Sequence, residues 1–209
     1  MREKKKPILW IGLLTLFMLF CCSLPYSISA NSAFQQKQNQ EIVNKMMNKQ
    51  ETVILGIPVL GDPDFLMKLE LGLQNLKQKS FYDFQYVSQY VGRIEQGDHS
   101  VVTSSKKIPI VYMNPRTLER VSIPSVGSWL VHEACHVEMY RSKDRDPSKN
   151  RYDNQQRGEL KCIQKEAYAL KKLGGTQDED NFLYHQDGLH FDVNKDGKWT
   201  SEDTKAQNW

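Results

Sequence analysis

Apolar residues recur every three or four positions in four stretches of the chain, and this period predicts four helices. Asp62, followed by proline, is expected to cap the first helix, and Ser80 the second. Ser125 is expected to cap a third helix that ends near Arg141, and the fourth covers residues 154–173. The apolar positions of the first two helices are Phe65, Leu66, Leu69, Leu73, Leu76, Phe81, Phe84, Val87, Tyr90 and Val91.

Short β-prone runs lie between the predicted helices. Residues 52–60 are apolar and β-branched but include a glycine and a proline, which favours a short edge strand or an extended segment. Residues 93–95, 100–103 and 108–112 are separated by turn residues and predict a small antiparallel meander. The chain is therefore expected to mix helices with a small sheet.

The first 30 residues have the pattern of an export signal. Residues 1–6 are basic, residues 8–24 are almost entirely apolar, and residues 27–30 are mostly small, as signal peptidase requires. We expect residues 1–30 to be a signal peptide of a secreted or cell-envelope protein. The length of the apolar run leaves an uncleaved N-terminal membrane anchor as the alternative, and this segment is the only membrane contact expected. Residues 31–50 are predicted to be a polar linker.

The positive net charge of the chain comes from the predicted export signal. The net charge of +3 arises from 28 basic and 25 acidic residues, of which four and one lie within residues 1–30, leaving 24 of each. A neutral remainder does not offer the basic surface that nucleic acid requires. We therefore expect a monomer with a single main domain and no nucleic-acid partner.

The third predicted helix contains the sequence His132-Glu133-Ala134-Cys135-His136. Residues four apart lie on the same face of a helix, so both imidazoles could bind one zinc ion. Zinc with an open coordination position lowers the pKa of a bound water toward neutrality. Glu133 is then placed to act as the general base.

A third zinc ligand is expected on the fourth helix, at Glu159 or Glu166. A chain that turns back after residue 141 passes the level of the two histidines about seven residues into the next, antiparallel helix, which favours Glu159. Glu166 would lie about 10 Å further along, beyond both histidines. It remains the alternative ligand.

The motif and the following glutamate resemble those of gluzincin-type zinc metallopeptidases. In that family a helix bearing the ligand glutamate, with a small residue three positions later, follows the H-E-x-x-H helix; Glu159 with Cys162 and Glu166 with Ala169 both match. The resemblance covers residues 125–174, about a quarter of the chain, and implies an α+β zincin-like fold with a small antiparallel sheet packed on the motif helix. The family's aspartate four residues after the ligand is absent here, so the residue that orients a zinc-bound histidine stays open.

Two cysteines lie outside the export signal, Cys135 in the motif and Cys162 on the fourth helix. An isolated pair in an exported protein suggests a disulfide, which would join the two metal-bearing helices. Two buried free thiols are the alternative.

A second metal site is predicted near the C-terminus, in residues 186–209. Oxygen side chains occupy loop positions 1, 3, 5, 9 and 12, glycine occupies position 6, and a backbone carbonyl would serve at position 7. Asp at position 12 resembles dockerin loops more than regulatory EF-hands. The expected calcium ligands are Asp192, Asn194, Asp196, the Lys198 carbonyl, Thr200 and Asp203.

Taken together, the sequence predicts an exported zinc metallopeptidase, with residues 51–185 as its catalytic domain and a peptide or protein as its substrate. The strand at residues 108–112 could pair with that substrate as an edge strand. Stabilisation of the reaction's oxyanion is open among Tyr152, Tyr168, His185 and His190. The rival hypothesis is a non-catalytic, exported metal- and calcium-binding protein that acts as a surface docking module.

Overall fold

The computed structural model describes residues 48–104, 107–144 and 147–189 together with residues 192, 195, 197 and 198, and the fold of this part is α+β. The predicted export signal and residues 31–47 of the predicted linker lie outside the described residues. None of the helices described combines the length and apolar character that a membrane crossing needs.

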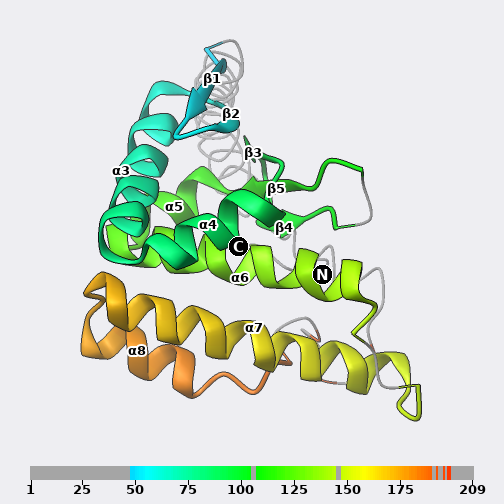
Figure 1. The fold of residues 1–209 in the computed structure, drawn as a ribbon. Helices are drawn as coiled ribbons and strands as arrows, with labels where there is room; N and C mark the ends of the chain where they lie inside the picture. The colour runs from blue at the N-terminus through cyan, green and yellow to red at the C-terminus, as the bar shows by residue number, and fades with distance from the viewer. Residues whose placement is uncertain are drawn as a thin grey trace, which may run out of the picture. The chain divides into compact units, whose positions relative to one another are not determined.

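Five strands form one small mixed sheet in the order β1-β2-β3-β5-β4 (Figure 1). The edge strands β1 and β4 are antiparallel to their neighbours, but β2–β3 and β3–β5 are parallel. The prediction of an antiparallel sheet is therefore wrong for the central pairs. Two helices carry the chain from β2 back to the same end of the sheet, so β3 is parallel to β2, and the chain passes through β4 between β3 and its other parallel partner, β5. The strands are β1 Gln50–Ile54, β2 Ile57–Gly61, β3 Arg93–Gln96, β4 Val101–Val102 and β5 Ile110–Met113.

Two strand predictions need correction. Residues 52–60 form a hairpin rather than one segment, because Leu55 and Gly56 adopt φ values of 50° and 91° and reverse the chain between β1 and β2. The strand predicted at residues 108–112 is not an edge strand, because β5 lies between β3 and β4. Among the strands described, β4 is at the edge on that side of the sheet.

Six helices are present in the described residues, and a side-chain hydrogen bond caps the start of each except α4, where Ser80 takes the predicted cap position without one. The Asp62 side chain accepts a hydrogen bond from Phe65 N at 2.9 Å, so Asp62 caps α3 as predicted. The metal-motif helix begins earlier than expected: Ser122 is its cap, because Pro124 fits the first turn of a helix. The helices are α3 Pro63–Lys79, α4 Phe81–Tyr90, α5 Pro115–Arg120, α6 Ile123–Ser142, α7 Arg151–Leu173 and α8 Gln177–Tyr184.

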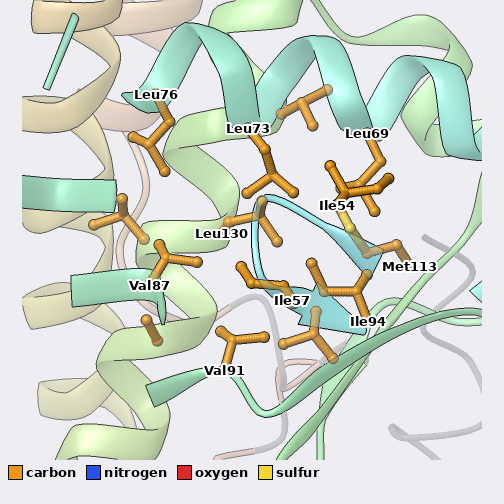
Figure 2. Close-up of a cluster of buried hydrophobic side chains, with 14 of the residues drawn as sticks. Ile54, Ile57, Leu69, Leu73, Leu76, Val87, Val91, Ile94, Met113 and Leu130 are labelled. Carbon is orange, nitrogen blue, oxygen red and sulfur yellow. The ribbon is translucent and has the colours of Figure 1, made fainter. Parts of the chain in front are cut away.

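One hydrophobic core joins the sheet to α3, α4 and α6 (Figure 2). Helices α3 and α6 approach each other closely at Gly72 and Gly127, where an added Cβ would overlap Val126 and Leu173 respectively. Glycine at both positions allows α6 to lie against the core. The buried residues labelled in Figure 2 are Ile54, Ile57, Leu69, Leu73, Leu76, Val87, Val91, Ile94, Met113 and Leu130.

Helix α6 lies between this core and most of α7, whose Ala169 and Leu173 near its C-terminal end belong to the core, and α8 packs on α7 (Figure 1). Glu179 joins α8 to the start of α6: its carboxylate accepts hydrogen bonds from Ser125 Oγ at 2.7 Å and from Thr176 N at 2.8 Å. Burial opposes ionisation of Glu179, but hydrogen bonds from Ser122, Thr176 and Ser125 outweigh it and lower the pKa to about 2.

The Glu179→Gln substitution should therefore destabilise the protein in a pH-dependent way. A carboxylate whose pKa falls from 4.5 to about 2 on folding stabilises the native state above pH 4.5 and loses that effect as the pH falls toward 2. We expect a loss of about 1 kcal/mol in the free energy of unfolding at pH 7. Urea unfolding of both proteins at pH 7 and at pH 3 measures it. A difference that does not shrink at pH 3 would contradict the assignment.

Candidate metal centre

Helix α6 presents two histidines to α7, of which His132 is buried and His136 is partly exposed. His132 and His136 stand one turn apart, with their Nε2 atoms 2.9 Å apart and their ring centroids 4.7 Å apart. His132 is only 7% exposed. Both Nε2 atoms thus point toward one place between the helices.

Glu159 on α7 completes this group. Its Oε2 atom lies 3.3 Å from His136 Nε2 and 3.5 Å from His132 Nε2. These three residues could hold a metal ion, since their ligand atoms all lie within 4.8 Å of one another. The two helices run antiparallel. The turn between them is of a length that places Glu159 at the level of the two histidines, as predicted.

The other candidate ligand, Glu166, lies on the opposite side of His132. Its Oε2 atom is 3.0 Å from His132 Nδ1, the ring nitrogen that faces away from Glu159. The expectation that Glu166 lies beyond both histidines is wrong, because α7 continues along α6 toward its N-terminus and so reaches His132. A carboxylate at Nδ1 is the usual partner that fixes the orientation of a metal-binding histidine.

Gln155 is a further contact that the sequence analysis missed. Its Nε2 donates to Glu159 Oε1 at 2.8 Å, which leaves Oε2 directed at the histidines. Gln155, Glu159, Cys162 and Glu166 share one face of α7, at positions i, i+4, i+7 and i+11. The glutamine four residues before Glu159 is the sequence signal that could have revealed this contact.

The predicted disulfide between Cys135 and Cys162 is present, with the two Cα atoms 5.5 Å apart. It joins α6 to α7 beside the histidines: Cys162 Sγ is 3.8 Å from His136 Nδ1. Both cysteines are fully buried. A bridge between residues 27 apart in sequence stabilises a protein by about 3 kcal/mol.

Glu133 lies on α6 next to His132 and is 7% exposed. Burial raises the pKa of its carboxyl, and the neighbouring His132 and His136 oppose that shift. Trp129 Nε1 donates to Glu133 Oε1 at 3.0 Å. The sequence analysis treated Trp129 only as an apolar helix position, although its spacing of four residues from Glu133 permits this contact.

The donor set fits a divalent cation. Burial would lower the pKa of His132, but the carboxylates of Glu159, Glu166 and Glu133 outweigh it and raise that pKa well above 6.5. So many buried carboxylates are costly without a compensating cation. Ligands at zinc distances of about 2.0–2.2 Å in tetrahedral directions lie roughly 3.3–3.6 Å apart. The separations of Glu159 Oε2 from the two histidines match this range, whereas the two Nε2 atoms, 2.9 Å apart, lie closer together.

None of the described residues considered for oxyanion stabilisation has a described contact with the metal group. Tyr152 donates its hydroxyl hydrogen to Asp192 Oδ2 at 2.7 Å. Tyr168 is 66% exposed beside Lys172. His185 is exposed, and its Nδ1 lies 2.6 Å from a backbone carbonyl of α8. His190 lies outside the described residues, so the structure assigns none of these four to the metal group.

The predicted calcium loop is described at four of its residues. Asp192 is buried, and its Oδ2 atom accepts a hydrogen bond from Gly197 N at 3.0 Å. Gly197 and Lys195 adopt φ values of 76° and 56°, as a sharply turning loop requires. Lys198 is exposed. The remaining predicted ligands, which lie outside the described residues, are Asn194, Asp196, Thr200 and Asp203.

Comparison with known proteins identifies no relative: no protein-family model matches the sequence, and no curated protein or solved structure matches the chain.

Substitution of the two glutamates should distinguish a metal ligand from a residue that only orients one. Glu159→Gln should abolish stoichiometric zinc binding, since it removes the carboxylate at the histidine pair. Glu166→Gln should leave one zinc per chain and weaken its affinity by about 10- to 100-fold. Elemental analysis and competition with a chelator measure both. Loss of zinc in Glu166→Gln alone would make Glu166 the third ligand instead.

Proposed function

We propose that this chain is an exported zinc metallopeptidase of the gluzincin type. The observation that carries the proposal is the buried group of His132, His136 and Glu159, with the Glu133 carboxylate beside it. The disulfide between α6 and α7 supports export, because such bonds persist mainly in oxidising compartments. The substrate would be a peptide or protein.

Each residue of the centre has a separate role in peptide hydrolysis. A zinc ion, when bound, polarises the scissile carbonyl and makes a water molecule more acidic. His132, His136 and Glu159 hold the ion. Glu133 accepts the proton of the attacking water on its carboxylate and donates it to the leaving amine. Burial raises the pKa of the Glu133 carboxyl toward neutral pH. A group whose pKa lies near the working pH can both accept and donate a proton.

The edge of the sheet offers a route for binding a peptide. Val101 and Val102 of β4 pair only with β5 within the described residues, and β4 also contacts α6. Val101 is half exposed. Addition of a peptide strand to β4 would bind backbone groups and leave specificity to side-chain pockets.

The rival function is a non-catalytic binding protein in which the metal only supports the fold. A structural zinc site usually fills its fourth position with a protein ligand. Within the part of the chain that the structure describes, the group contains three ligand residues, with Glu133 contacting Trp129. This arrangement favours catalysis over a purely structural role.

The Glu133→Gln substitution tests the catalytic proposal directly. It retains the shape of the side chain but removes the base, so peptide cleavage should fall by about 10²- to 10⁴-fold while one zinc per chain remains. Cleavage of a quenched-fluorescent peptide library and elemental analysis provide the two measurements. Glu119→Gln, on the exposed face of α5, is the matched control and should retain full activity. Full cleavage by Glu133→Gln would refute the mechanism.

We also propose that the C-terminal loop binds calcium. The hydrogen bond from Gly197 N to Asp192 Oδ2 supports it, since it draws loop position 6 toward the carboxylate at position 1. Asp192 is also held by the Tyr152 hydroxyl of α7, so an ion at this loop would fasten the C-terminal segment to the helix that carries Glu159.

Calcium should therefore raise the thermal stability of the zinc-loaded protein. At a calcium concentration 100 times the Kd, binding adds about 2.7 kcal/mol to the free energy of unfolding. Asp196→Ala removes a carboxylate of the loop and should abolish this calcium-dependent rise in Tm. Differential scanning calorimetry of both proteins, with and without calcium, measures it. An equal rise in the two proteins would rule out the loop as the binding site.

A further inference from the structure

Trp129 makes a contact with Glu133 that core packing alone does not explain. Its ring is partly buried against the hydrophobic core, while its indole nitrogen donates to Glu133 Oε1 at 3.0 Å. Among the hydrogen bonds of the described residues, this is the one that reaches the Glu133 side chain. One carboxylate oxygen is thus engaged, and Oε2 takes part in no described hydrogen bond.

A carboxylate at this place needs something to fix its rotation. The terminal torsion of glutamate is broad, with no strongly preferred well, so packing around the preceding carbons does not fix the direction of the two oxygens. A hydrogen bond to one oxygen does fix it. A general base whose oxygen is not aligned with the attacking water transfers the proton slowly, because proton transfer requires that oxygen to lie within hydrogen-bond distance of the water.

The indole is chemically suited to this role. Its N–H group is a donor only and carries no lone pair that could accept a proton. It can therefore hold the carboxylate without competing for the proton that Glu133 must take up. A hydroxyl, imidazole or amine at the same place could exchange protons with the base.

We propose that Trp129 is a positioning residue for the general base: its indole N–H holds Glu133 Oε1 and directs Oε2 toward the water. This inference rests on the proposed peptidase function and extends it to a residue that binds neither metal nor substrate. It acts only through Glu133. Its removal should therefore affect the chemical step and leave metal binding unchanged.

The test replaces the indole N–H without changing the shape of the side chain. Site-specific incorporation of 3-benzothienylalanine at position 129 puts a sulfur atom in place of the N–H group and keeps the two fused rings. The expected result is a fall of about 10-fold in kcat, with KM and zinc content unchanged, as loss of one hydrogen bond to a charged group implies.

The outcomes separate this inference from the proposed function. An unchanged kcat in the position-129 variant of a protein that cleaves peptides would overturn the role of Trp129 and leave the peptidase intact. Loss of zinc or of thermal stability in that variant would also overturn it, since Trp129 would then be purely structural. Absence of peptide cleavage by the zinc-loaded, unsubstituted protein would overturn the peptidase proposal, and the role of Trp129 with it.

Discussion

The antiparallel packing of α6 on α7 is the contact on which the candidate centre depends. Neither helix holds the group alone: α6 supplies the two histidines, and α7 supplies Glu159 together with Gln155 and Glu166. A rotation of α7 by one residue, about 100°, would move both Glu159 and Glu166 away from the histidines at once. The disulfide fixes this rotation, because it joins the helices at the level of the histidines.

The centre is electrostatically demanding for a domain of this size. Buried carboxylates around two imidazoles oppose folding unless positive charge compensates them, and a small domain has a net stability of only about 5–15 kcal/mol. The hydrophobic core is on the other side of α6, where glycines allow α3 to approach closely. The same helix therefore joins a stabilising apolar face to a costly polar one, and the covalent bridge lies on the polar side.

Features that depend on local chemistry could be predicted from the sequence, whereas features that depend on pairing between distant segments could not. The cap at Asp62, the disulfide and the approach of Glu159 to the histidines follow from helix geometry and spacing. The parallel pairing of β3 with β5 does not, because strand pattern carries no information on direction. Contacts of Trp129 and Glu166 were missed because each residue also fits a simpler role, as an apolar helix position or a direct ligand.

Burial of the disulfide has a consequence for the order in which the protein matures. Both sulfur atoms lie where oxidants in solution have no access once the helices have docked. The disulfide must therefore form during folding, before α7 has packed stably on α6. The candidate centre is complete only after that event, since its residues come from both helices. Oxidative folding thus sets the time at which the three residues that could hold a metal ion come together.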